Sequence, residues 1–371
     1  MNPSSAKSKP EISARSRIHR LRLSFFGLRH DALLISHLPD IRYLCGFSGS
    51  AGFLLIEPDR ATLFTDSRYT FQARDEVSGA TIRIAKRGLL REAGESLRVS
   101  RRKRLTVGFS PAYLTVSQKQ ALESAAGPRV RWSPSGNEVE RLRAIKDASE
   151  LRLMKQAAAI ISGVFESLLP KIKPGMAELD LAAEAEFAMR RMGAEGPSFE
   201  TIVAAGPRSA WAHARPTSKL LRKNELVVLD QGAILRGYCS DMTRTVFLGR
   251  SSRRVRQLYG AVLEAQQAAK AAIRPGVEAG QVDAAARRVF AGYKLDRFFT
   301  HSTGHGLGIE VHEPPRIGRG DTTLLQPGMV VTVEPGLYVE GFGGIRIEDD
   351  VLVTANGVMD LTTSSRELFE L

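Results

Sequence analysis

Five residues in the second half of the chain have the types and spacing of a metal-ion site: Asp230, Asp241, His305, Glu334 and Glu348. Closely spaced carboxylates repel one another unless a positive charge lies between them. Four carboxylates and one imidazole form an oxygen-rich ligand set that suits Mn²⁺, Co²⁺, Fe²⁺ or Zn²⁺. Two such ions, about 3.5–4 Å apart, can hold and activate a water molecule for hydrolysis. The residue types therefore predict a dinuclear metallohydrolase.

The first two carboxylates belong to a predicted β-hairpin. Its strands cover Leu226–Asp230 and Tyr238–Leu248, with a turn near Arg236-Gly237. Folding the hairpin between residues 235 and 236 places Asp230 directly opposite Asp241. Opposed residues of antiparallel strands share one face, with Cβ atoms about 4.5–5.5 Å apart. We therefore expect the two aspartates to face each other.

A second predicted hairpin carries the other two carboxylates. Its strands cover Val330–Glu334 and Gly344–Glu348, joined by a Gly-rich turn. Folding this hairpin about Gly341 places Glu334 directly opposite Glu348. Each of these acids alone could be an ordinary turn or surface residue. Two opposed pairs in one domain favour a pair of metal ions instead.

A glycine-rich loop, Thr300–Glu313, contains three histidines, His301, His305 and His312. Glycines between them allow the backbone to approach an ion or a substrate closely. A phosphate-binding loop is the alternative, but the Lys-Ser/Thr pair that ends such loops is absent. The HExxH pattern of zinc peptidases is absent as well. The loop is therefore interpreted as the source of one metal ligand.

The composition is that of an ordinary globular protein. With 371 residues and 43% hydrophobic residues, the chain is expected to form two or three domains. It has no run of 18 apolar residues, no secretory signal pattern in Met1–Pro10, and two cysteines, so we expect a cytoplasmic protein. An organelle transit peptide is the alternative interpretation of the basic stretch before His30. The apolar spacing of Arg15–Leu28 favours a helix there.

Positive charge is concentrated in the first half of the chain. Residues 1–150 carry 26 Lys and Arg against 15 Asp and Glu, whereas residues 151–371 carry 27 against 25. Nucleic-acid binding is one interpretation of a basic half. The positive residues are mostly scattered, however, and only Arg101–Arg104 forms a dense cluster. A solvated surface is therefore the favoured interpretation.

The first part of the chain is predicted to be an α/β domain over residues 12–137. Helical patterns precede and separate four short β-rich segments, Ala32–Ser36, Gly52–Ile56, Ala61–Thr65 and Thr81–Ala85. One long charged helix, Glu138–Ala159, follows and is predicted to link the domains over residues 138–158.

The second part, residues 150–371, is predicted to be an α+β domain with an antiparallel sheet. Its predicted helices are Ile160–Leu169, Glu178–Met192 and Val255–Ile273, and its strands include the two hairpins. A helix pair followed by a hairpin occurs around residues 150–248 and again around 255–353. This order predicts two related halves around a pseudo-twofold axis, although no convincing residue-by-residue repeat is visible.

These motifs resemble the creatinase, prolidase and methionine aminopeptidase family, whose catalytic domain has the pita-bread fold. The intervals of 11, 64, 29 and 14 residues between successive ligands are similar to those of microbial prolidases. The resemblance extends to Ile41–Ser50 and Thr65–Tyr69, which are similar to the domain that precedes the catalytic one in prolidases and aminopeptidase P. Within the catalytic part it is carried by Leu229–Gly232, Tyr238–Thr245, His301–Glu313, Val333–Tyr338 and Gly344–Asp349.

The resemblance implies a role for each candidate residue. Asp230 and Asp241 would bind one metal ion, His305 and Glu334 would complete the second site, and Asp241 and Glu348 would bridge the two. Glu334 would also relay the proton of a metal-bridging hydroxide, the nucleophile. The implied substrate contacts are His213, His301, His312, Tyr338 and Arg346, of which His213 and His312 would act in catalysis.

For the histidines, a packing role is the alternative interpretation. The sequence Trp211-Ala before His213 also departs from many family members.

The implied activity is hydrolysis of the Xaa-Pro bond in peptides with proline in second position, by an Xaa-Pro aminopeptidase or an Xaa-Pro dipeptidase. Proline removes the amide N–H at that bond, so ordinary aminopeptidases fit it poorly.

The implied cofactors are two divalent ions, with Mn²⁺ or Co²⁺ favoured over Zn²⁺ or Fe²⁺. The implied assembly is a homodimer. A methionine aminopeptidase is one alternative, but such enzymes have at most a short extension before the catalytic domain. The other alternative is a non-catalytic pita-bread binding protein.

Overall fold

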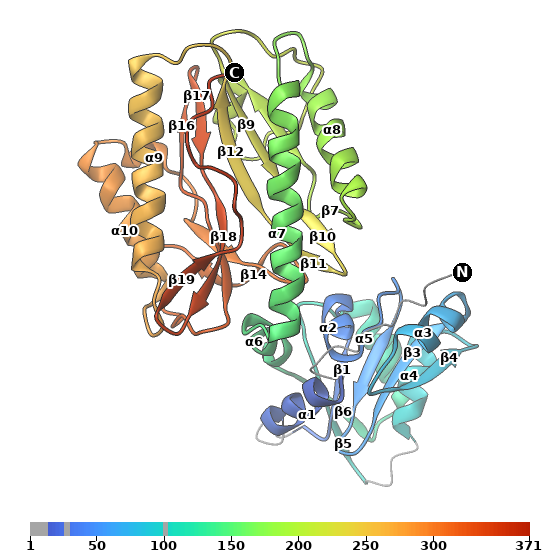
Figure 1. The fold of residues 1–371 in the computed structure, drawn as a ribbon. Helices are drawn as coiled ribbons and strands as arrows, with labels where there is room; N and C mark the ends of the chain where they lie inside the picture. The colour runs from blue at the N-terminus through green and yellow to red at the C-terminus, as the bar shows by residue number, and fades with distance from the viewer. Residues whose placement is uncertain (1–13, 26–29, 99–102) are drawn as a thin grey trace, which may run out of the picture. The chain divides into compact units, whose positions relative to one another are not determined.

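A six-stranded mixed sheet forms the centre of the N-terminal unit, Met1–Arg143 (Figure 1). This unit and a second one, Ala144–Leu371, make up the computed structural model, which describes residues 14–25, 30–98 and 103–371. The strand order is β4-β3-β2-β1-β5-β6. Its strands are β1 Ala32–Ile35, β2 Phe53–Ile56, β3 Ala61–Asp66, β4 Thr81–Ala85, β5 Leu105–Phe109 and β6 Val130–Pro134.

Helices surround this sheet, as the α/β prediction requires. Leu97 of α4 and Leu122 of α5 are buried in one hydrophobic cluster with Leu34, Phe64 and Val107 of the sheet. The helices are α1 Ala14–Phe25, α2 Leu38–Cys45, α3 Thr70–Glu76, α4 Leu89–Arg98, α5 Val116–Ala126 and α6 Glu138–Ala144.

Four of the six strands match the predicted segments, and β5 and β6 were not predicted. The helix predicted for Arg15–Leu28 corresponds to α1, and its last three residues lie outside the described ones. Two residues of the basic cluster Arg101–Arg104 also lie outside them.

The single helix predicted for Glu138–Ala159 is wrong, because the chain leaves the helix at residues 145–147. A new helix, α7, then runs over Ala148–Leu168 and includes most of the separately predicted helix Ile160–Leu169. Asp147 caps α7 by accepting hydrogen bonds from the backbone N–H groups of Ser149 and Glu150. The Glu150 side chain in turn accepts from the Asp147 N–H, which completes a capping box.

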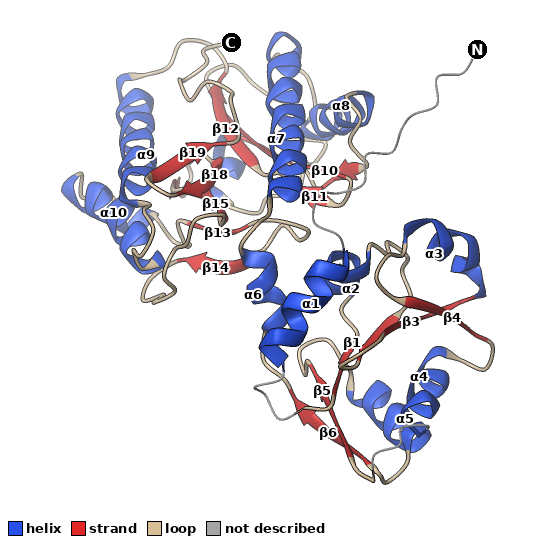
Figure 2. Cartoon of the chain, turned by 60° about the horizontal axis from the view of Figure 1, so that its bottom comes forward, coloured by secondary structure: helices blue, strands red, loops and turns tan. Residues whose placement is uncertain are grey.

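The second unit contains four long helices around several antiparallel ladders. Figures 1 and 2 show α7 near α8 and α9 near α10, with β12 and β18 between α7 and α9. The further helices are α8 Glu178–Arg191, α9 Arg253–Ala272 and α10 Ala279–Gly292. The ladders are β11-β10-β7, β12-β9-β8, β14-β13-β15-β18-β19 and β16-β17. The α+β prediction with an antiparallel sheet is confirmed.

The strands of this unit are short and mostly buried. Those of the first half are β7 Gly196–Pro197, β8 Ile202–Ala205, β9 Leu226–Gln231, β10 Ala233–Leu235, β11 Tyr238–Cys239 and β12 Met242–Phe247. Those of the second half are β13 Gly304–Gly306, β14 Glu313–Ile317, β15 Val330–Val333, β16 Gly336–Val339, β17 Gly343–Arg346, β18 Asp349–Thr354 and β19 Gly357–Asp360.

The two halves repeat one arrangement of backbone contacts, which supports the predicted pseudo-twofold. The Gly175 N–H donates to Leu221 O at 2.9 Å, and the Gly276 N–H donates to Leu325 O at 2.8 Å. Both glycines have a positive φ, 90° and 82°, which other residues rarely adopt. A few residues after these two leucines, β9 ends one residue after Asp230 and β15 ends one residue before Glu334.

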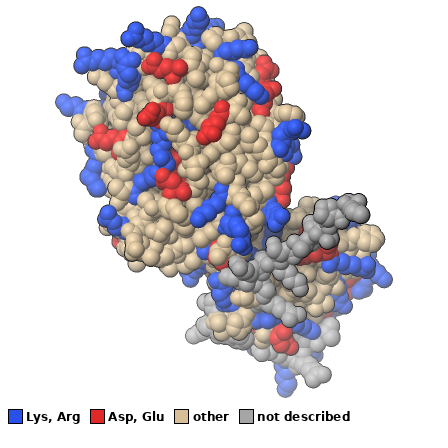
Figure 3. Space-filling view, in the orientation of Figure 1, with Lys and Arg blue, Asp and Glu red and all other residues tan. Residues whose placement is uncertain are grey.

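Charged side chains of both signs are interspersed over the face of the second unit shown in Figure 3. Several basic ones make ion pairs at the surface, such as Lys171 with Glu184 at 2.6 Å. Within the part of the chain that the structure describes, no helix is long and apolar enough to cross a membrane.

Candidate metal centre

The first hairpin has a register that differs from the predicted one by two residues. Asp230 of β9 lies opposite Thr243 of β12, and the same register places Asp241 opposite Gly232. The prediction that Asp230 lies directly opposite Asp241 is therefore wrong. The turn residues Arg236 and Gly237 have φ values of 49° and 79°, so the hairpin folds between them. A shift of two residues keeps both aspartates on one face as diagonal neighbours.

The second hairpin has the predicted register. The pairs Val333–Asp349 and Gly336–Arg346 lie on either side of the two glutamates with one common register, which places Glu334 opposite Glu348. The strands themselves pair differently from the prediction. β15 pairs with β18, and β16 pairs with β17, so the two acids lie where one ladder passes into the other.

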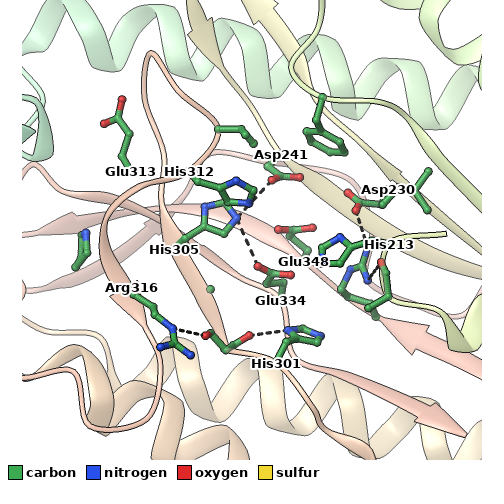
Figure 4. A pocket seen from close by; sticks show the side chains of 18 of the residues that line it. His213, Asp230, Asp241, His301, His305, His312, Glu313, Arg316, Glu334 and Glu348 are labelled. Atoms are coloured by element: carbon green, nitrogen blue, oxygen red, sulfur yellow. Dashed lines mark hydrogen bonds and ion pairs between the residues drawn. The ribbon is translucent and has the colours of Figure 1, made fainter. Parts of the chain in front are cut away.

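Three candidate ligands form the tightest group. One ligand atom from each of Asp241, His305 and Glu348 lies within 4.8 Å of the others. The Nε2 atom of His305 is 3.7 Å from Asp241 Oδ2 and 3.5 Å from Glu334 Oε1 (Figure 4). His305 Nδ1 lies 3.0 Å from Gly306 O, and donation there directs the Nε2 lone pair toward the carboxylates.

The remaining aspartate is held by an arginine. Asp230 Oδ2 accepts a hydrogen bond from Arg346 Nη2 at 2.5 Å. Its other oxygen, Oδ1, is buried and makes no hydrogen bond within the described residues, and the same is true of Asp241 Oδ1. Buried carboxylate oxygens without a donor are costly unless a cation contacts them. These two oxygen atoms therefore fit the ligand positions of a metal ion.

The acids of the cluster are hard to ionise together. Burial, followed by the charges of Glu348 and Asp230, raises the pKa of Asp241 well above its usual value. Burial raises the pKa of Glu334 to about 8 and that of Glu348 well above its usual value. Burial also lowers the pKa of His305 to about 4, so its imidazole is neutral at pH 7. Divalent cations would supply the positive charge that these four carboxylates require.

A cavity of about 870 Å³ opens onto the cluster. All five candidate ligands line it, together with His213, His301, His312 and Arg346. The His312 ring packs edge-on against the His305 ring, with 4.3 Å between their centroids. Figure 4 shows His213 on the side of Asp230 and His301 below Glu334. The structure thus brings the predicted ligands and three predicted substrate histidines into one cavity.

Arg346 begins a chain of hydrogen bonds along the cavity wall. Its Nη1 donates to the Tyr338 hydroxyl at 2.8 Å, and that oxygen lies 2.8 Å from His301 Nε2. His301 Nδ1 lies 2.7 Å from Ser302 O, and donation there makes Nε2 the acceptor for Tyr338. Burial lowers the pKa of His301 to about 4 and raises that of Tyr338 to about 12. Tyr338 is not among the lining residues and contacts two of them instead.

Two residues next to the ligands were not predicted. Thr243 Oγ1 donates to Glu348 Oε2 at 2.6 Å and accepts from Arg346 Nε at 2.9 Å. Arg244 is fully buried, donates to Glu348 O at 2.5 Å and pairs with Asp349 at 2.9 Å. Both belong to the segment that contains Asp241. The alternation of the strand could have identified Thr243, because it is two residues from Asp241.

Comparisons with known proteins agree with this geometry. Residues 152–355 match metallopeptidase family M24, and residues 17–145 match the creatinase/prolidase N-terminal domain. An uncharacterized peptidase of Bacillus subtilis is 41% identical over 355 residues, which cover 96% of this chain and 100% of that protein.

Two solved structures are similar over nearly their whole length. An Xaa-Pro dipeptidase from Bacillus anthracis has a TM-score of 0.92 and 38% identity, covering 96% of this chain and 100% of that one. An X-Pro aminopeptidase from Thermotoga maritima has a TM-score of 0.87 and 36% identity, covering 94% of this chain and 100% of that one.

The fold and the site together define a metal-dependent peptide hydrolase. The chain belongs to metallopeptidase family M24 and carries the N-terminal domain of creatinases and prolidases. Membership of this family implies divalent metal ions. The predicted family, fold and enzyme class are confirmed.

Proposed function

We propose that the protein is an exopeptidase that hydrolyses the Xaa-Pro bond of peptides with proline in second position, as an Xaa-Pro aminopeptidase or dipeptidase. The observation that carries this proposal is the single cavity that contains all five candidate ligands and His213, His301 and His312. The similar proteins from Bacillus anthracis and Thermotoga maritima, named for Xaa-Pro substrates, support it.

In this proposal the ligands hold two divalent ions. Asp230 and Asp241 would hold one ion, His305 and Glu334 would hold the other, and Asp241 and Glu348 would contribute to both sites. The oxygen-rich donor set suits Mn²⁺, Co²⁺, Fe²⁺ or Zn²⁺, and the family resemblance favours Mn²⁺ or Co²⁺ among them. When bound, the two ions would supply a water molecule of lowered pKa as the nucleophile.

The protein's own residues bind the substrate and move the protons. Glu334 borders the cavity beside His305, where it can take a proton from the attacking water and return it to the leaving proline nitrogen. His312 and His213 contribute N–H groups toward the scissile carbonyl, where negative charge develops. The free N-terminus of the substrate binds beside the carboxylates. His301, held by Tyr338, borders the space for the proline ring.

Three peptides test this function on metal-loaded protein: Ala-Pro, Ala-Pro-Ala and Met-Ala-Ser. We expect cleavage of Ala-Pro, of Ala-Pro-Ala or of both. Ala-Pro alone would identify a dipeptidase, and Ala-Pro-Ala would identify an aminopeptidase. Cleavage of Met-Ala-Ser alone would contradict the proposal in favour of a methionine aminopeptidase. Cleavage of none would favour the non-catalytic binding protein.

A further inference from the structure

A buried ion pair joins two segments that lie far apart in the sequence. Lys146 Nζ lies 3.2 Å from Glu313 Oε2, and the two side chains are only 1% and 3% exposed. Lys146 belongs to the break between α6 and α7, and Glu313 begins β14. Glu313 also directly follows His312, a proposed substrate contact. The pair therefore connects the start of the catalytic unit to the edge of the cavity.

The backbone around Lys146 is held in place independently of its side chain. The Lys146 N–H donates to Gly328 O at 2.9 Å, and Ile145 forms a β-bridge with Met329. Gly328 has a φ of +92°, and a Cβ added there would come within 3.0 Å of Ile145 Cγ2. Lys146 is thus fixed against the residues that lead into β15. Its ammonium group has a defined position from which to hold a partner.

The Glu313 carboxylate organises the loop that contains His312. Its Oε1 accepts from the Glu310 N–H at 3.1 Å. The Gly308 N–H donates to Glu310 O at 3.0 Å, and a Cβ added at Gly308 would lie 2.6 Å from a Glu313 oxygen. The backbone of residues 308–313 therefore wraps around this carboxylate.

The opposite end of the loop is anchored as well. Gly306 pairs with Glu313 across an irregularity between β13 and β14, directly after His305. This short loop positions the His312 ring, whose centroid is 4.3 Å from that of the His305 ring. A change in the position of Glu313 would therefore move His312 relative to the ligand His305.

We infer that Lys146 is a positioning residue: through Glu313 it sets the place of the His312 ring in the cavity. The loss of one partner of a buried ion pair leaves an uncompensated buried charge and is strongly destabilising. In this inference the Glu313 carboxylate escapes that cost by moving toward water, and the movement unwinds residues 308–313. This inference rests on the proposed function, because it assigns Lys146 to the substrate contact made by His312.

The activity test compares variants on an Xaa-Pro substrate. We expect Lys146→Met to lower kcat/KM by between about tenfold and about a hundredfold, as small displacements of substrate-positioning groups do. Metal content should stay unchanged, because no ligand is altered. In a His312→Ala background, Lys146→Met should cause no further loss, since the two changes act through the same ring. Equal losses in both backgrounds would overturn the inference.

A second readout needs no substrate. Hydrogen exchange of the intact protein should show faster exchange of the backbone amides of residues 307–313 in Lys146→Met than in the unaltered protein. Faster exchange there without any Xaa-Pro cleavage by the unaltered protein would refute the proposed function and leave the positioning role of Lys146 standing. Unchanged exchange together with unchanged kcat/KM would overturn the inference, even if the melting temperature fell.

Two further variants complete the design. Glu313→Gln removes the charge but keeps an acceptor for the Glu310 N–H, so the same readouts apply if Lys146→Met does not fold. We expect it to change kcat/KM and loop exchange in the same direction as Lys146→Met. Lys171→Met is the matched control, because it breaks the exposed pair with Glu184, whose side chains are 49% and 43% exposed. It should leave both readouts unchanged, and a loss equal to that of Lys146→Met would overturn the inference.

Discussion

At the scale of single residues, the metal-free site should depend on pH in a defined direction. A carboxyl whose pKa is raised in the folded state binds its proton more tightly there than in the unfolded chain, so stability falls as pH rises toward the folded pKa. Burial raises the pKa of Glu334 to about 8. His301 and His305, with pKa values lowered to about 4, act in the opposite direction, but only below their ordinary pKa of about 6.5.

We therefore predict that the metal-free protein loses stability between about pH 6.5 and pH 8. The loss should be at most about 1.4 kcal/mol per pH unit for each proton released. Urea denaturation of chelator-treated protein at several pH values measures it. Glu334→Gln should make the decline shallower, because it removes a titrating group. A free energy of unfolding that rises between about pH 6.5 and pH 8 would contradict the prediction. It would show that the buried acids lose their protons at a smaller cost than their burial indicates.

Asp241→Asn should separate activity from stability. The amide cannot supply an anionic oxygen to a metal ion, so we expect activity to fall by at least about a hundredfold. This loss is larger than the loss of about tenfold to a hundredfold that follows when a residue hydrogen-bonded to a metal ligand is replaced. The metal-free variant should be as stable as the metal-free parent or more stable, because a neutral amide replaces a buried carboxyl that is costly to ionise. Elemental analysis, peptide assays and thermal melts check these expectations. Full activity after chelator treatment would contradict metal dependence.

Residue types and spacing identified the ligand cluster but not its geometry. The five candidates were found because carboxylates recur at strand positions around a histidine loop. The register of the first hairpin was predicted wrongly, because Arg236 adopts a left-handed φ that nothing in its type indicates. Thr243 and Arg244 were missed for another reason. Their partners, Glu348 and Asp349, lie more than one hundred residues away in the sequence.

At the scale of elements, the repeated turns at Gly175 and Gly276 allow a paired test. Both residues have a positive φ, and a Cβ added at either one would meet nothing within 4 Å. We expect Gly175→Ala and Gly276→Ala each to destabilise the protein by about 1–2 kcal/mol, through backbone strain alone. Urea denaturation measures both. Strongly unequal losses would contradict the structural equivalence of the two turns.

The start of α7 offers a second test at this scale. Asp147→Ala removes the acceptor for two backbone N–H groups, so we expect a destabilisation of about 0.5–2 kcal/mol. The same residue explains why the linker helix was predicted wrongly. Asp147 and Glu150 form a capping-box pattern in the sequence, but the apolar spacing of Val139, Leu142, Ile145 and Leu151 continues across it. Periodicity alone does not show where one helix ends and another begins.

At the scale of the whole molecule, the order of helices and hairpins predicted two related halves with antiparallel strands, and the family resemblance implied the pita-bread fold of the catalytic unit. The repeat between its halves was predicted from that order and not from residues. The shared features are few, such as Pro-Gly at 174–175 and 275–276 and Leu-Leu at 220–221 and 324–325. Strands β5 and β6 of the N-terminal unit were missed. β6 is short and half-exposed, so it lacks a marked apolar pattern.

The homodimer implied by the family resemblance stays a prediction. Light scattering of the purified protein should give about twice the mass of one chain. A strict monomer that retains full Xaa-Pro activity would contradict this prediction.

The contacts of Arg244 have a consequence for the order of events during synthesis. This buried side chain donates to the carbonyls of Ser364 and Ser365, 120 and 121 residues further along the chain, and to Glu348. A ribosome therefore releases Asp230 of β9 and Asp241, which precedes β12, long before the carbonyl groups that hold Arg244 of β12 exist. The nascent first half has neither a complete ligand set nor a settled strand on which to hold one. In the proposed function, the complete ligand set therefore exists only after the second half has been translated.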